Sequence, residues 1–253
     1  MIDRRSQAGV VKRAGVCYLT AMGMGLKDRV EELYERVEAA AARCGRSAEE
    51  IAVVAVSKTV AAERVREAYD CGLRVFGESR VQEAVEKAPE LPKDIEWQFI
   101  GHLQSNKVKF LPQFADWVQS VDRVEIAEKL ARRYHELGRT VQVLLELNTS
   151  GEDSKHGFGS PQEALDAASQ IAALDGVALR GAMTIGPFTD DESEIRAAFA
   201  VLRRFFEQLQ TKLPDARLDT LSMGMSNDFE YAIEEGATMI RPGSVLFGPR
   251  SAR

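Results

Sequence analysis

The sequence is poor in cysteine, lacks long hydrophobic runs and carries no excess of positive charge. No apolar run approaches the roughly 20 residues of a membrane-spanning helix, so we expect no membrane anchor. The three cysteines, Cys17, Cys44 and Cys71, form no CxxC pair and no metal-binding spacing, which is typical of a protein of the reducing cytoplasm. The formal net charge of -6 gives no support to general nucleic-acid binding.

The first 25 residues combine four basic side chains with one short apolar stretch at residues 16–19. This composition is compatible with a weak export or transit signal, but the stretch is short and no clear cleavage site follows it. We therefore interpret residues 1–25 as a disordered extension, or as the result of a start codon placed too early. The folded protein is then expected to begin near Met24.

Hydrophobic periodicity predicts a regular order of elements after this extension. Apolar residues at helical spacing predict an amphipathic helix over residues 26–44, closed by Gly45. Residues 51–56 are continuously apolar and rich in β-branched side chains, as in a strand buried on both faces of a parallel sheet. Further strands are predicted at residues 74–77, 97–100, 116–121, 141–147, 179–185, 220–223 and 239–241.

Helix-like segments lie between most of these strands. They are predicted at residues 61–70, 81–87, 124–137, 161–174, 194–213 and 228–235. Eight strands with short connections favour a closed α/β barrel of the (β/α)8, or TIM, type over an open doubly wound sheet. No Pro- or Ser-rich linker divides the chain, so residues 26–253 are interpreted as one domain, an N-terminal helix followed by the barrel.

Lys58 stands at the end of the first predicted strand, and active sites of such barrels lie at the C-terminal ends of the strands. A lysine above a buried apolar strand can have the pKa of its amine lowered, which makes it a nucleophile toward aldehydes. From its position alone, an exposed lysine that reaches into solvent is the better interpretation. His102 and His156 also follow strands, but each is more typical of an exposed or structural histidine than of a catalytic one.

Glycine and serine recur after the seventh and eighth strands, in residues 222–228 (SMGMSND) and 241–244 (RPGS). Ser226 is a natural helix N-cap, and Gly224 permits close backbone approach. Because phosphate sites of barrels often lie between these two loops, the turns predict a phosphate-binding site. Ordinary turn chemistry would account for them as well, and on their own it is the better interpretation.

These motifs resemble those of the pyridoxal phosphate homeostasis protein family, the YggS-like proteins. The matching segments run in one order from about residue 26 to the end of the chain. They are AVSKT (55–59), FGE (76–78) with VQE (81–83), WQFIGHLQSNK (97–107), Asn148 with KHGF (155–158), LRGAM (179–183), LSMGMS (221–226) and MIRPGS (239–244).

The resemblance implies a barrel like the N-terminal domain of alanine racemase, with pyridoxal 5'-phosphate (PLP) bound as a Schiff base to Lys58. It implies that Arg241 faces the pyridine nitrogen. Many family members have Asn at the position of Ser79, so the cofactor contact of Ser79 is left open. The phosphate is expected to be held by Ser222, Ser226, Gly243 and Ser244.

The implied function is that of a cytoplasmic carrier or buffer, which we expect to be a monomer that holds PLP reversibly and passes it to apo-enzymes. Arg241 beside the pyridine nitrogen would disfavour its protonation and make the ring a weaker electron sink. The chain also ends soon after the eighth strand, so we expect no second domain to supply the opposing Tyr of alanine racemase. The alternatives are a PLP-dependent amino-acid racemase with Lys58 as one base, and a barrel enzyme acting on a phosphorylated metabolite without PLP.

Overall fold

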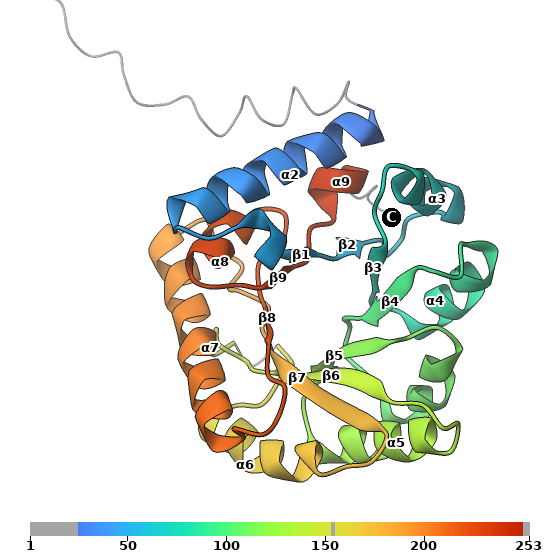
Figure 1. Cartoon of the computed structure of the whole chain (residues 1–253), viewed down its shortest axis with the longest axis vertical. Helices are drawn as coiled ribbons and strands as arrows, with labels where there is room; N and C mark the ends of the chain where they lie inside the picture. The colour runs from blue at the N-terminus through green and yellow to red at the C-terminus, as the bar shows by residue number, and fades with distance from the viewer. Residues whose placement is uncertain (1–24, 153–154, 250–253) are drawn as a thin grey trace, which may run out of the picture.

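A ring of parallel strands stands at the centre of the computed structural model, which describes residues 25–152 and 155–249 (Figure 1). The strands follow one another in a single sheet in the order β1-β9-β8-β7-β6-β5-β4-β3-β2. Their bounds are β1 (Ala52–Val53), β2 (Ala55–Val56), β3 (Val75–Glu78), β4 (Glu96–Phe99), β5 (Trp117–Val121), β6 (Val141–Glu146), β7 (Val177–Met183), β8 (Thr220–Ser222) and β9 (Met239–Ile240).

The ring closes because β1 and β2 are two halves of one extended stretch, separated only by Val54. On one side the N–H group of Val54 donates to the carbonyl of Ile240 at 2.9 Å. On the other side, Ala55 and Val56 pair with β3 in parallel register. The nine labelled strands therefore occupy eight positions. The predicted (β/α)8 barrel is confirmed, and the open sheet is wrong.

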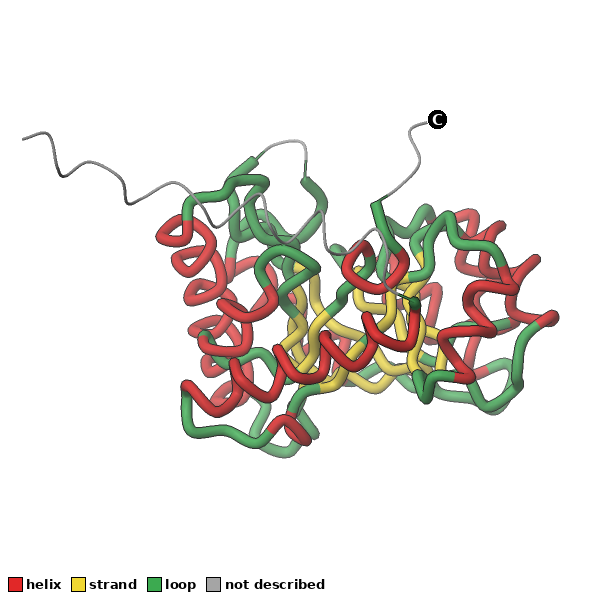
Figure 2. Tube along the Cα trace, turned by 90° about the horizontal axis from the view of Figure 1, so that it is seen from above, coloured by secondary structure: helices red, strands yellow, loops and turns green. Residues whose placement is uncertain are grey.

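Helices surround this ring (Figure 1), and the view turned by 90° shows helices on either side of the strands (Figure 2). Each predicted helix is present with ends shifted by no more than two residues. They are α2 (Leu26–Arg43), α3 (Ala62–Asp70), α4 (Val81–Lys87), α5 (Val124–His135), α6 (Pro161–Ala172), α7 (Glu192–Lys212) and α8 (Phe229–Glu234). The short helix α9 (Ser244–Phe247) was not predicted. The apolar face of α2 packs against the two short helices α8 and α9, so α2 covers this part of the barrel's outer layer.

A 3-10 helix, η3 (Ser105–Gln113), connects β4 to β5 where no helix was predicted. Its buried residues Val108 and Leu111 are three positions apart, and buried Phe114 follows after three more. This spacing matches the three residues per turn of a 3-10 helix, which places such residues on one face. Two further short 3-10 helices are η1 (Ala48–Glu50) and η2 (Ala88–Glu90).

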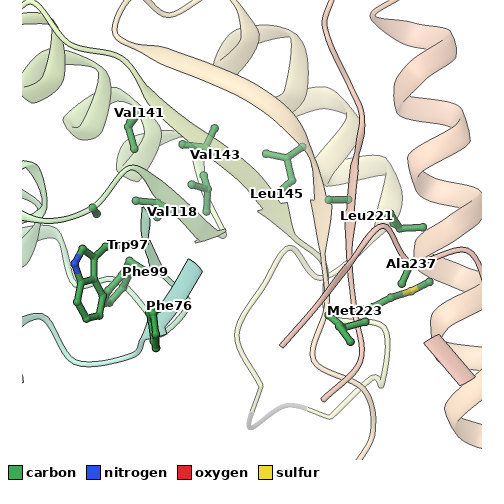
Figure 3. Close-up of a cluster of buried hydrophobic side chains, with 14 of the residues drawn as sticks. Phe76, Trp97, Phe99, Val118, Val141, Val143, Leu145, Leu221, Met223 and Ala237 are labelled. Carbon is green, nitrogen blue, oxygen red and sulfur yellow. The ribbon is translucent and has the colours of Figure 1, made fainter. Parts of the chain in front are cut away.

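Side chains alternate between two environments along the strands. Trp97, Phe99 and Val118 belong to a large apolar cluster between the sheet and the helices (Figure 3). Gln98 and Gln119, on the same strands, point to the other side, because successive side chains of a strand face opposite ways. There, in the interior of the ring, the amide of Gln119 donates to the side-chain oxygen of Gln98. The interior of the barrel is thus partly polar.

Two expectations concern the ends of the chain and membranes. The predicted extension of residues 1–25 lies, apart from Gly25, outside the described residues, as does Cys17. Within the described residues, no helix is both long and apolar enough to cross a membrane.

Candidate functional site

A cavity of about 280 Å³ opens at the C-terminal ends of the strands. Its walls come from the segments that follow β2, β3, β4, β6 and β7, which agrees with the position predicted for a barrel active site. Lys58 is half-buried in this cavity, and Ser79 lies in the wall beside it. The lining residues are Lys58, Ser79, Ile100, Gly101, His102, Glu146, Leu147, Asn148, Lys155, His156 and Ile185.

Lys58 occupies a tight turn directly after β2. The next residue, Thr59, has φ of 64°, and among the described residues it is the single non-glycine residue with positive φ. This conformation is unfavourable for a β-branched side chain. Such backbone strain is found mainly at functional sites, where the surrounding structure must hold it in place.

A partly buried network of hydrogen bonds and ion pairs holds this turn on both sides of the lysine. A carboxylate oxygen of Glu83 accepts from the N–H group of Thr59 at 2.5 Å. Lys87 donates to the carbonyl of Ser57 at 2.9 Å and to the same oxygen of Glu83 at 2.9 Å. The residues before and after Lys58 are thereby tied to helix α4.

Glu78, at the end of β3, completes the network. Its carboxylate accepts from Lys87 at 2.7 Å and from the hydroxyl of Ser57 at 2.8 Å. Glu78 is fully buried and Lys87 is 7% exposed. Burial raises the pKa of Glu78, whereas the charge of Lys87 opposes that rise. We call Ser57, Thr59, Glu78, Glu83 and Lys87 the lysine-turn network.

Arg241 lies buried just beyond β9, the strand that pairs with β1 and so neighbours the stretch that leads to the lysine turn. It donates to the hydroxyl of Ser222 at 2.6 Å and to the carbonyl of Thr184 at 2.7 Å. Burial lowers the pKa of Arg241 to about 10, and the negative charges of Asp228 and Glu146 oppose this change. The guanidinium therefore remains a cation at neutral pH. The hydroxyl of Ser222 is engaged by Arg241 in this arrangement.

Glu146, the last residue of β6, belongs to the cavity but was not predicted. Burial raises its pKa to about 7, repulsion by Asp122 adds to the rise, and Arg241 opposes it. Within the described part of the chain, one oxygen of its carboxylate has no hydrogen-bond partner. The signal that could have revealed Glu146 is a lone acid in the otherwise apolar end of its strand, Val-Leu-Leu-Glu-Leu.

The structure brings the two predicted Gly/Ser turns together. The hydroxyl oxygen of Ser226 accepts from the N–H groups of Gly243 at 2.9 Å and Val245 at 3.3 Å. Gly243 leaves little room, because a Cβ atom there would lie 3.3 Å from the carbonyl oxygen of Val56. Ser244 is exposed at the start of α9. The first strand therefore meets both turns at one end of the barrel.

Two details of these turns can be compared with the sequence predictions. Gly224 has φ of 91°, and a Cβ atom there would lie 2.9 Å from the Cα atom of Phe229, so the predicted close approach is confirmed. The prediction that Ser226 is an N-cap is wrong. Asp228 occupies the N-cap position of α8, and its carboxylate accepts from the N–H group of Met225 at 2.5 Å. Ser226 instead joins the two turns.

The loop after β6 also reaches the cavity. The ammonium group of Lys155 donates to Glu152 at 2.6 Å and to the carbonyl of Gly186 at 2.9 Å. The imidazole rings of His102 and His156 stack with their centroids 3.7 Å apart. Lys155, His102 and His156 all line the cavity.

Known proteins resemble this chain over most of its length. A model of the alanine racemase N-terminal domain matches residues 29–251. Pyridoxal phosphate homeostasis proteins of Pasteurella multocida and Escherichia coli K12 are 40% and 41% identical to the chain, over 90% and 87% of its length and 98% and 94% of theirs. The chain belongs to the pyridoxal phosphate homeostasis protein family. The resemblance inferred from the sequence motifs is thus confirmed.

Two solved structures that resemble the chain differ widely in how much sequence they share with it. PipY of Synechococcus elongatus, whose structure was determined with PLP bound, is 38% identical, with a TM-score of 0.78 over 88% of this chain and 100% of PipY. Alanine racemase of Clostridium difficile is only 15% identical, with a TM-score of 0.69 over 90% of this chain and 57% of the racemase. The second likeness shows a shared fold alone.

Proposed function

We propose that the protein binds PLP as a Schiff base on Lys58 and acts in PLP homeostasis as a carrier or buffer. The observation that carries this proposal is the position of Lys58, half-buried in the cavity on a turn that the lysine-turn network holds on both sides. PipY, a close relative in sequence, has been seen with PLP bound. When present, PLP supplies an aldehyde carbon to which a neutral lysine amine can bond.

The residues around Lys58 fit such a group at both of its ends. We propose Ser226, Gly243 and Ser244, in the two Gly/Ser turns, as contacts of the phosphate. The N–H group of Gly243 donates to the hydroxyl of Ser226 in this structure, so a phosphate would have to take over this donor. Ser222 is proposed as a further contact of the phosphate. Its hydroxyl already accepts a hydrogen bond from Arg241. Ser79 lies in the cavity wall near Lys58, where it can reach the cofactor.

Arg241 is proposed to face the pyridine nitrogen. A buried cation at this place disfavours a second positive charge, so the nitrogen would stay unprotonated. An unprotonated ring stabilises carbanions poorly, which favours holding the cofactor over catalysis. We therefore propose that the protein has no efficient catalytic activity of its own.

Amino-acid racemisation is the alternative function, and the residues that line the cavity make it worth testing. It requires proton transfer on both faces of an α-carbon, and Lys58 could serve one face. His102, His156, Glu146 and Lys155 also line the cavity, so groups able to move a proton are present there. What speaks against racemisation is the buried charge of Arg241. The relatives' name, pyridoxal phosphate homeostasis protein, also points away from it.

Solvent deuterium exchange separates the two functions. The PLP-loaded protein is incubated in deuterated water with L- and D-amino acids, and deuterium at the α-carbon is measured. The carrier proposal expects no more exchange than free PLP gives. Turnover near the enzyme median of about 10 per second would establish a racemase instead.

The carrier function itself is tested by transfer. Protein loaded with PLP is mixed with an apo-enzyme that requires PLP, and recovery of that enzyme's activity is followed. We expect the activity of the apo-enzyme to recover faster than it would if PLP first had to dissociate slowly into solution and then bind the enzyme. No recovery over hours would limit the role to storage.

Three further properties are proposed with this function. The described elements form one barrel, so residues 26–253 are treated as a single domain. We propose a monomer, which light scattering coupled to size-exclusion chromatography would test. We also propose a cytoplasmic location, on the basis of the sparse cysteines.

A further inference from the structure

Three potential metal ligands converge at the mouth of the cavity. His102 follows β4, Asp122 follows β5 and His156 lies in the loop after β6. One ligand atom from each lies within 4.8 Å of the other two. Across residues 25–152 and 155–249, no other three His, Cys, Asp or Glu side chains come together in this way. The proposed function gives these three residues no part.

The spacing of the first two ligands already suits a metal ion. Nδ1 of His102 lies 3.3 Å from one carboxylate oxygen of Asp122. Two ligands bound tetrahedrally to zinc at about 2.0–2.1 Å are separated by about 3.4 Å. The other carboxylate oxygen of Asp122 accepts from Arg123 at 2.5 Å, which fixes the carboxylate and leaves the first oxygen toward the imidazole.

His156 must move slightly to complete the set. Its ring lies nearly parallel to that of His102, at 15° and a centroid distance of 3.7 Å. Imidazole lone pairs lie in the ring plane, so two parallel rings cannot point at one ion. One ring therefore has to turn about its Cβ–Cγ bond, and the exposed ring of His156 is the one proposed to turn.

We propose that His102, Asp122 and His156 bind a divalent transition-metal ion, Zn²⁺ in the first place, beside the cavity that contains Lys58. Two imidazoles and one carboxylate are a zinc ligand set that leaves a fourth position open to water or another ligand. Mg²⁺ and Ca²⁺ prefer sites built from oxygen atoms and are not expected to compete. This proposal does not depend on PLP binding.

The test is a titration of the full-length, untagged protein with Co²⁺ and Zn²⁺, with and without PLP. We expect one equivalent of Co²⁺ to bind with the visible absorption of a four-coordinate ion, and Zn²⁺ to displace it. His156→Ala and His102→Ala should each weaken Zn²⁺ binding by more than the roughly 10- to 100-fold that loss of an outer-shell partner costs. Asp122→Asn should weaken it as well, since the negative charge is lost.

Matched controls separate this site from surface binding. His135→Ala removes the exposed third histidine, on α5, and Cys44→Ser removes an exposed thiol. Both variants should bind Zn²⁺ as the parent does. Zn²⁺ affinity that survives His156→Ala and His102→Ala, or that is lost in either control variant, would overturn the proposal. Melting curves without metal verify that each variant is folded.

Discussion

Replacing Lys87 with methionine should destabilise the protein strongly, because Lys87 is the cation of the lysine-turn network. Methionine keeps much of the length of the side chain but none of the charge. Glu78 would then be left fully buried without its ion-pair partner. Removing one partner of a buried pair costs about 3–5 kcal/mol of folding free energy. Domains of this kind are stable by about 5–15 kcal/mol, so we expect Lys87→Met to fold with reduced stability.

The loss should depend on pH. Burial raises the pKa of Glu78 and Lys87 opposes that rise, so removing Lys87 raises the pKa further. A carboxyl whose pKa is higher in the folded state favours folding most below its unfolded value, and this contribution is lost as pH rises through the folded value. Lys87→Met should therefore lose more stability at pH 8 than at pH 5.

Urea unfolding, followed by fluorescence of the buried Trp97 and Trp117, measures the effect at both pH values. Lys129→Met is the matched control, since Lys129 forms a partly exposed pair with Glu125 on one helix. Because both side chains of that pair are largely exposed to solvent, its contribution to stability is expected to be small. If Lys87→Met changes the unfolding free energy by no more than Lys129→Met does, the reasoning about the network is refuted.

A second substitution separates stability from positioning. In Lys87→Met combined with Glu78→Gln, the buried charge is gone, and much of the stability should return. The carbonyl of Ser57 still lacks its donor, so the turn that carries Lys58 remains loosely held. We expect PLP to leave this double variant at least several-fold faster than the parent. Recovery of both properties together would indicate that the network supports the fold alone.

Two other predictions concern the cavity. Ser226→Ala and Ser244→Ala should each weaken PLP binding by about 1–2 kcal/mol in equilibrium dialysis, which is the scale of one hydrogen bond. Pyridoxal, which lacks the phosphate, should lose more affinity, and equal affinity for pyridoxal and PLP would mean that the phosphate site is misplaced. Because the pKa of Glu146 is raised to about 7, its carboxylate costs stability increasingly as pH rises from about 5 to 8. Glu146→Gln should abolish this dependence and raise the unfolding free energy at alkaline pH by up to about 3 kcal/mol, whereas an unchanged pH profile in urea would contradict the assignment.

The barrel could be predicted from the sequence because its strands are short apolar runs that alternate with amphipathic helices. The predicted strands and helices were close to those observed, since burial on both faces leaves a clear pattern in a run such as residues 51–56. The 3-10 helix η3 was missed because its three-residue spacing of Val108, Leu111 and Phe114 matches neither the helical nor the strand period that was sought.

The site was predictable only where local motifs carry it. Lys58 and the Gly/Ser turns stand out at strand ends, so they could be named from the sequence. The contacts that hold them could not, because Lys87, Glu83 and Glu78 meet the lysine turn only through the fold. The role of Ser226 was mistaken for the same reason, since its hydroxyl serves a turn 17 residues away instead of its own helix.

The most direct test of the account is the covalent attachment of PLP to Lys58. Purified protein is saturated with PLP, its absorbance is recorded before and after borohydride reduction, and the modified peptide is mapped. We expect one reduced adduct, on Lys58, and a folded Lys58→Ala protein without the Schiff-base band. Full adduct occupancy in Lys58→Ala, for example on Lys155 in the same cavity, would contradict the account.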